Sequence, residues 1–119
     1  MIKIPNKLKV GGQDIDVVFQ NTNNSDKMGE CCLWNGRIKI SELYKGEPQT
    51  ESSKLNTFYH ELTHAILDTM GEYDLSSNER FVCTFSGFLC ESLRSFEYNN
   101  EEKNDKEIKS RDRDWCGLV

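Results

Sequence analysis

The chain has 119 residues, enough for one domain with one hydrophobic core. Its net charge of −5 argues against a general nucleic-acid surface, because such surfaces need clustered lysine and arginine. There is neither a secretory signal nor an apolar run of about 20 residues, the length of a membrane helix. We therefore expect a cytoplasmic protein with no membrane partner. The five cysteines are irregularly spaced and form no C-x-x-C motif, which indicates reduced thiols.

The N-terminal part of the chain has the pattern of β-strands. Residues 8–19 alternate apolar and polar side chains around Gly11-Gly12, which predicts a hairpin. Residues 31–40 do the same around Asn35-Gly36, a strong signal for a second hairpin. The polar residues 21–27 are expected to form a loop between them. The sequence therefore predicts a small antiparallel sheet made of two hairpins.

Two helices are predicted after a polar connector. Over residues 54–70 apolar side chains recur every three or four positions, and Gly71 is placed to end that helix. Ser76 and Glu79 have the S-x-x-E form of a capping box, so a second helix is expected to begin there. The expected apolar stripes are Leu55, Phe58, Leu62, Ile66 and Thr69 on the first helix, and Phe81, Val82, Phe85, Phe88, Leu89, Leu93 and Phe96 on the second.

The composition changes sharply after Tyr98. Residues 99–114 are almost all polar or charged, so they cannot bury enough apolar surface to fold alone. Residues 115–119 form an apolar end that either docks on the domain or binds a partner. The sequence therefore predicts an α+β domain over residues 1–98, with the sheet packed on both helices. Residues 99–119 are expected to be a charged C-terminal extension, either a solvated helix or a mobile tail.

The segment His60-Glu61-Leu62-Thr63-His64 carries the functional signal. Histidines four positions apart lie on one face of a helix, so their ring nitrogens can reach one metal ion about 2 Å from each. Glu61 is about 100° around the helix from His60, where it can hold a water bound to that ion. The chain has only two histidines, and such a motif arises by chance with a probability on the order of 0.2%. The alternative is a pair of surface or hydrogen-bonded histidines.

A catalytic zinc site needs a third protein ligand. Asp68 lies one turn beyond His64 and fits better as a partner that orients a histidine. Glu72 lies in the turn after the helix, and Cys83 shares one flank of the second helix with Glu79. Plain antiparallel packing would bring residues near Cys83 level with the histidines, whereas crossed helices would bring Glu79 there. We favour Glu79, whose alternative role is that of a capping residue.

Residues 57–66, Thr-Phe-Tyr-His-Glu-Leu-Thr-His-Ala-Ile, resemble the extended signature of zincin metallopeptidases. In that signature uncharged residues surround His-Glu-x-x-His, and a hydrophobic residue follows two positions after the second histidine. A short β region, this helix and a second helix with a glutamate are together similar to the gluzincin branch. They also resemble the small metallopeptidase-like proteins of bacteriophages and prophages, and more distantly the ImmA/IrrE type. The resemblance covers roughly residues 7–96, of which only the ten-residue signature is specific.

The resemblance implies a minimal zincin-like fold and a zinc-dependent peptidase that acts on a protein or peptide. Glu61 would be the general base, and the zinc ligands would be His60, His64 and Glu79. Most gluzincins have a further domain that walls the cleft, and this length leaves no room for one. A small cleft, or one completed by self-association, is therefore implied.

Two features are candidates for handling a peptide substrate. The strand over residues 36–40 is expected to pair with it by its edge. Tyr73, just after the metal helix, is a candidate donor to the developing oxyanion, although a tyrosine near a helix end more often packs.

Two other classes of function fit the same residues. A phage-type protein would retain zinc and grip a host or regulatory protein without catalysis, using its acidic surface and residues 115–119. A structural zinc site closed by Glu79 and a cysteine would make folding depend on metal, but has no need of Glu61. Glu61→Gln separates the first rival from a peptidase, because only a peptidase would lose its effect while keeping the metal. If no metal binds, Glu61 is a solvated helix carboxylate.

Overall fold

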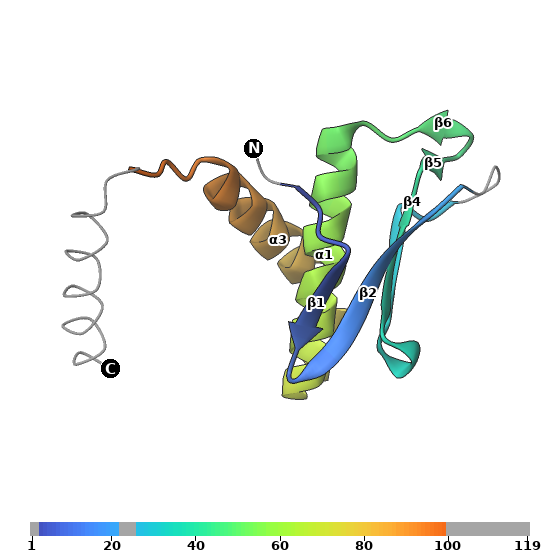
Figure 1. Ribbon diagram of the computed structural model, residues 1–119. Coiled ribbons are helices and arrows are strands. Elements are labelled where there is room, and N and C mark those ends of the chain that lie inside the picture. Colours follow the sequence, from blue (N-terminus) through green and yellow to red (C-terminus); the bar gives the residue numbers. More distant parts are fainter. Residues whose placement is uncertain (1–2, 22–25, 100–119) are drawn as a thin grey trace.

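The computed structural model describes residues 3–21 and 26–99. It has an α+β fold, as predicted, in which the strands precede the long helices along the chain (Figure 1). The predicted extension therefore lies, apart from Asn99, outside the described residues. Within these ranges, no helix combines the length and apolar character that a membrane span requires. The strands are β1 (Lys7–Val10), β2 (Gln13–Gln20), β3 (Gly29–Cys32), β4 (Arg37–Ser41), β5 (Leu43–Tyr44) and β6 (Glu47–Pro48). The helices are η1 (Leu33–Asn35), α1 (Glu51–Met70), α2 (Tyr73–Ser77) and α3 (Glu79–Arg94).

Both predicted hairpins are present in the main sheet. β1 pairs with β2 and β3 pairs with β4, each antiparallel. The strand order is β1-β2-β4-β3, and β2 lies parallel to β4, so the sheet is mixed where an antiparallel one was expected. Turn signals fix the pairing within a hairpin, but they do not decide which strands meet between hairpins.

The strand order corrects the expected path of a substrate. β4 contains most of the predicted edge segment, residues 36–40, but it lies inside the sheet with hydrogen-bonded neighbours on both sides. It therefore has no free edge, and the prediction that it pairs with a peptide is wrong. β3 is the strand at that edge of the sheet, and it contacts α1.

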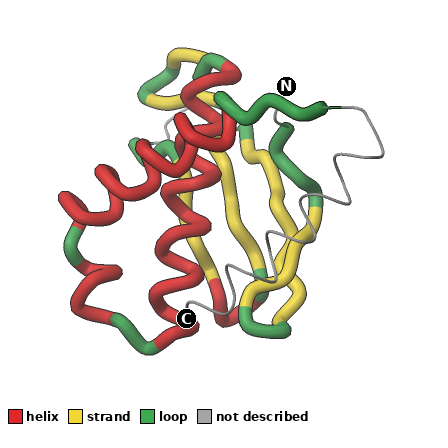
Figure 2. The backbone as a smooth tube through the Cα atoms, turned by 90° about the vertical axis from the view of Figure 1, so that its left-hand side faces the viewer, coloured by secondary structure: helices red, strands yellow, loops and turns green. Residues whose placement is uncertain are grey.

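The long helix α1 lies between the sheet and α3 (Figure 1), and the strands stand behind the helices in Figure 2. It begins three residues earlier than its apolar period suggests, because the Thr50 side chain caps it by accepting a hydrogen bond from the Ser53 N–H. It ends as predicted at Gly71, whose φ of 83° lies in the left-handed region.

Burial on α1 differs from a single stripe, because the helix has neighbours on two sides. Ile15, Ile38 and Ile40 of the sheet are fully buried and form one core cluster with Leu55, Phe58 and Ala65 of α1. Ile66 and Thr69, both expected in the core, are exposed. The spacing of apolar residues predicted the helix correctly, but it predicted only some of the residues that the helix buries.

The start of α3 also corrects an expectation. Asn78 is its N-cap, and the Asn78 side chain accepts a hydrogen bond from the Phe81 N–H. The predicted capping box of Ser76 and Glu79 is therefore absent, and Ser76 belongs to α2. Only a narrow side of α3 is fully buried, at Val82, Ser86 and Cys90, while Phe85, Phe88 and Phe96 of the predicted stripe are exposed.

Candidate metal centre

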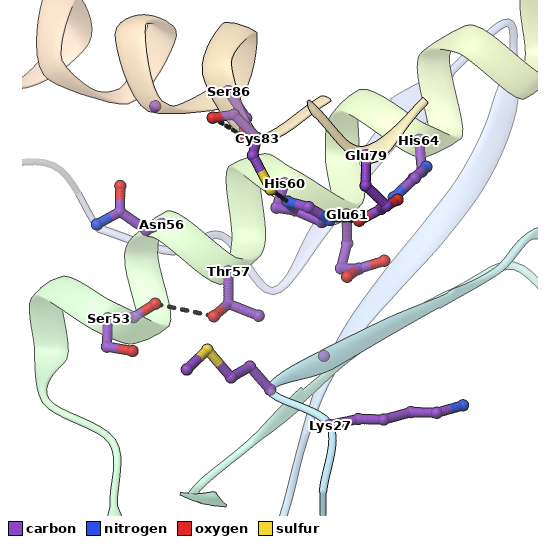
Figure 3. A pocket seen from close by; sticks show the side chains of 13 residues that line it. Lys27, Ser53, Asn56, Thr57, His60, Glu61, His64, Glu79, Cys83 and Ser86 are labelled. Atoms are coloured by element: carbon purple, nitrogen blue, oxygen red, sulfur yellow. Dashed lines mark hydrogen bonds and ion pairs between the residues drawn. The ribbon is translucent and has the colours of Figure 1, made fainter. Parts of the chain in front are cut away.

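Three side chains of the types that bind metal ions meet between α1 and α3. His60 and His64 are one helical turn apart on α1, and Glu79 is the first residue of α3. His60 Nε2 lies 3.2 Å from Glu79 Oε1, and His64 Nε2 lies 3.0 Å from Glu79 Oε2. Figure 3 shows these side chains pointing toward one another, with Glu61 beside them. Their ligand atoms all lie within 4.8 Å of one another, so this group could hold one metal ion.

Glu79 reaches the histidines because of the way the chain turns after α1. Gly71 ends α1, the short helix α2 follows, and α3 then begins at Glu79, whose carboxylate lies beside His64. α3 crosses α1 at an angle in Figure 1 instead of running plainly antiparallel to it, and its first residue, Glu79, lies beside both histidines. Among the described residues, neither Asp68 nor Glu72 belongs to the group of donors.

A second side chain contacts the Nδ1 atom of each histidine, on the side of the ring opposite Glu79. Ser76 Oγ lies 3.0 Å from His64 Nδ1, and Cys83 Sγ lies 3.7 Å from His60 Nδ1. Metal-binding histidines usually bond their second nitrogen to a neighbour, which fixes the ring orientation. A hydroxyl can donate or accept, so Ser76 suits either tautomer of His64. Cys83, a rival third ligand in the sequence analysis, thus lies on the nitrogen of His60 that faces away from the donor group.

The position of Ser76 was missed by sequence reasoning. The pattern Ser76-x-x-Glu79 indicated a helix cap, and no local signal relates Ser76 to a histidine twelve positions earlier. In the fold, Ser76 is only 7% exposed and faces His64.

Glu61 is buried beside this group and is not one of the donors. It is 9% exposed, and burial raises its pKa to about 7, with the negative charges of Glu79 and Glu30 adding to the effect and Lys27 opposing it. A carboxyl group with a pKa near neutrality can accept and return a proton at physiological pH. A cation bound nearby would favour its ionised form and lower this value.

Burial also lowers the pKa of His60, although the carboxylate of Glu79 acts in the opposite direction. A lowered pKa favours the neutral imidazole at physiological pH. Neutral imidazole is the form that binds a metal ion. The environment of His60 therefore suits it as a ligand.

The edge strand β3 passes directly over Glu61 at Gly29. A Cβ atom on Gly29 would lie 2.5 Å from Thr57 Cγ2 and 3.3 Å from Glu61 Cγ. Any larger residue at this position would displace a side chain of α1. Sequence reasoning also missed Gly29, because its contact joins parts of the chain that are far apart in sequence.

An open cleft of about 840 Å³ lies over the donor group. It reaches from β3, across α1, to α3, and Figure 3 shows its lining side chains. Tyr73, the candidate oxyanion donor, is 65% exposed and does not line this cleft, so the geometry does not support that role. The cleft is lined by Lys27, Met28, Gly29, Ser53, Asn56, Thr57, His60, Glu61, His64, Glu79, Cys83, Ser86 and Gly87.

No protein-family model matches the chain, and neither a curated protein nor a solved structure does. The resemblance to zincins therefore stays a prediction made from residues 57–66.

Proposed function

We propose that the protein is a zinc-dependent peptidase. One observation carries the proposal: His60, His64 and Glu79 converge in an open cleft, beside a buried carboxyl group that is not one of the donors. Catalytic zinc sites use three protein ligands and keep one position open, whereas structural sites use four. Two imidazoles and one carboxylate are donors that suit zinc.

The residues around the donor group have distinct roles in this proposal. When bound, zinc polarises a carbonyl group and lowers the pKa of water. Glu61 takes the proton of the attacking water on its carboxylate and passes it to the leaving amine. Ser76 and Cys83 hold the two imidazole rings so that each Nε2 faces the ion.

β3 replaces β4 as the strand that holds the substrate. Its outer edge has no strand partner in the part of the chain that the structure describes, and it lies beside Glu61. An extended peptide can add to such an edge through main-chain hydrogen bonds. Because Gly29 has no side chain, the main chain of β3 lies close to Thr57 and Glu61 of α1.

A second candidate is a metal-containing protein of the phage type that grips another protein without catalysis. Exposed aromatic side chains on α3 favour it, since Phe85 and Phe88 are 48% and 66% exposed. Exposed apolar groups of this kind often mark binding surfaces.

Zinc content and peptide cleavage, measured on the same preparations, test the proposal. We expect about one zinc per chain in the wild type and in Glu61→Gln, and loss of zinc in His64→Ala and Glu79→Ala. Glu72→Ala is the matched control, since Glu72 is a nearby carboxylate outside the donor group. Cleavage of a mixture of synthetic peptides, detected by mass spectrometry, should require wild-type Glu61.

The other results have clear meanings. Cleavage by Glu61→Gln at the wild-type rate would exclude Glu61 as the base. Zinc without cleavage would favour the binding protein. A folded wild type that takes up no zinc would contradict both candidates.

A further inference from the structure

Gly87 is a glycine that the fold does not require. Five of the other described glycines have positive φ angles, which residues with a side chain rarely adopt, and Gly29 has close contacts with Thr57 and Glu61. Gly87 lies inside α3, and a Cβ atom added to it would meet nothing within 4 Å beyond its chain neighbours and the backbone of its own helix. Glycine is less favourable than alanine inside a helix. Neither backbone conformation nor packing therefore explains a glycine here.

Gly87 lies where two hollows meet. The cleft over the donor group, of about 840 Å³, and a second hollow of about 750 Å³ share Asn56, Cys83 and Gly87 in their linings. The second hollow continues along α3 past Phe88 to Arg94. One groove thus leads from the metal centre between α1 and α3, which cross at an angle in Figure 1. A side chain at position 87 would stand in the space that joins the two hollows.

We propose that Gly87 sets the substrate specificity of the peptidase. A peptide bound at the metal centre runs along this groove, and one bulky apolar side chain of the peptide occupies the gap over Gly87. This inference rests on the proposed function and names the class of peptide that the site accepts.

The walls of the gap suit such a side chain. Phe88, the residue after Gly87, is 66% exposed and lines the second hollow beside the gap, so an apolar group that reaches it would bury aromatic surface. The thiol of Cys83 adds a weakly polar contact. Asn56 is exposed on α1 opposite, and its amide can both donate to and accept from a peptide main chain.

The position of the bulky side chain can be bracketed from α3. Glu79 and Gly87 are eight positions apart, which corresponds to roughly 12 Å along a helix. An extended peptide covers that length in about four residues. A short peptide anchored on the ion therefore reaches the gap.

Binding of peptide hydroxamates to the zinc-loaded protein tests the proposal. A hydroxamate chelates zinc, and its peptide part of four residues would extend into the groove. The series consists of an all-alanine peptide and peptides in which one tryptophan is moved through the four positions, with affinities measured by isothermal titration calorimetry. In the wild type, we expect tryptophan at one position to strengthen binding by about tenfold or more.

Substitutions on α3 locate the effect. Gly87→Leu should abolish the gain in affinity that tryptophan gives over the all-alanine peptide. Ser92→Leu is the matched control, because it places the same side chain at an exposed position of α3 outside both hollows, and it should keep the gain. Gly87→Ala should raise the midpoint of thermal unfolding by about 3–6 °C, since the fold does not need this glycine.

Three results would overturn the proposal. They are an unchanged gain in Gly87→Leu, no gain from tryptophan at any position in the wild type, and a lowered unfolding midpoint in Gly87→Ala. Because binding does not need catalysis, the two proposals fail separately. A selective loss in Gly87→Leu without any peptide cleavage would support the groove and contradict the peptidase, and cleavage with an unchanged gain would do the reverse.

Discussion

The side of α1 that packs into the core and the side that faces the cleft bury different kinds of side chain. On the core side, Phe58 and Ala65 are 2% and 0% exposed among apolar neighbours. On the cleft side, the helix buries the carboxyl group of Glu61 and leaves His60 and His64 partly buried. Apolar burial stabilises a fold, whereas burying a carboxylate costs free energy. One helix thus supplies both the stability of the domain and a site that reduces it.

A core substitution should produce the largest loss of stability. Phe58→Ala removes an aromatic side chain from the main apolar cluster and should cost about 3–5 kcal/mol in the free energy of unfolding. Denaturant unfolding, with zinc and with a chelator, measures this cost, which should be similar in both. Ser92→Ala, at an exposed position, should change stability by less than about 0.5 kcal/mol. A loss below about 1 kcal/mol for Phe58→Ala would contradict the view that the core side of α1 stabilises the domain.

The buried carboxyl group makes the stability of the metal-free protein depend on pH. The pKa of Glu61 is raised from its ordinary 4.5 to about 7, so the folded state holds the proton more tightly than the unfolded state. The resulting stabilisation is fully present below about pH 4.5 and is lost as the pH rises to about 7. The loss is up to about 3 kcal/mol, because one pKa unit corresponds to about 1.4 kcal/mol.

Glu61→Gln provides the control for this effect, since glutamine does not titrate. Urea unfolding of both proteins in chelator, at steps from pH 4.5 to pH 8, isolates the contribution of Glu61. The wild type should lose more stability over this range than the variant. Parallel curves for the two proteins would show that burial of Glu61 is less costly than its surroundings indicate.

Zinc bound by the donor group should raise the free energy of unfolding, and this gain should depend on the cleft side of α1. At free zinc about 100-fold above the dissociation constant, the folded state gains about 2.7 kcal/mol. His64→Ala should lose this gain, because the variant lacks one of the three donors. Thermal unfolding with zinc and with chelator measures the difference, and Glu72→Ala should behave like the wild type. An equal gain in His64→Ala would place the zinc elsewhere on the chain.

The same contrast explains how much could be predicted from the sequence. Local signals were reliable: Asn35-Gly36 marks a hairpin, Gly71 ends α1, and the spacing of His60 and His64 places both on one face of a helix. These features depend on residues within a few positions of one another. The buried face of α3 was predicted less accurately, because the sequence alone does not distinguish an exposed phenylalanine such as Phe88 from a buried one.

Features that join distant segments were not predictable in this way. The parallel pairing of β2 with β4 moved the free edge of the sheet to β3. The contact of Gly29 with Glu61 depends on that edge crossing α1, and no pattern around Gly29 indicates it. Glu79 could be favoured only by assuming crossed helices. The site is therefore partly visible in the local sequence and partly a product of tertiary packing.

Ser76 offers the finest test of the cleft side, because its proposed effect acts only through His64. Ser76→Ala removes the hydroxyl 3.0 Å from His64 Nδ1 and should weaken zinc binding by about 10- to 100-fold. Ser77→Ala is the matched control, since Ser77 is the next residue of α2 and is exposed. Zinc affinity measured by competition with a chromogenic chelator should fall for the first variant and not for the second. Equal affinities would mean that core packing of α1 alone holds His64 in place, and the cleft side would then depend on the core side for its geometry.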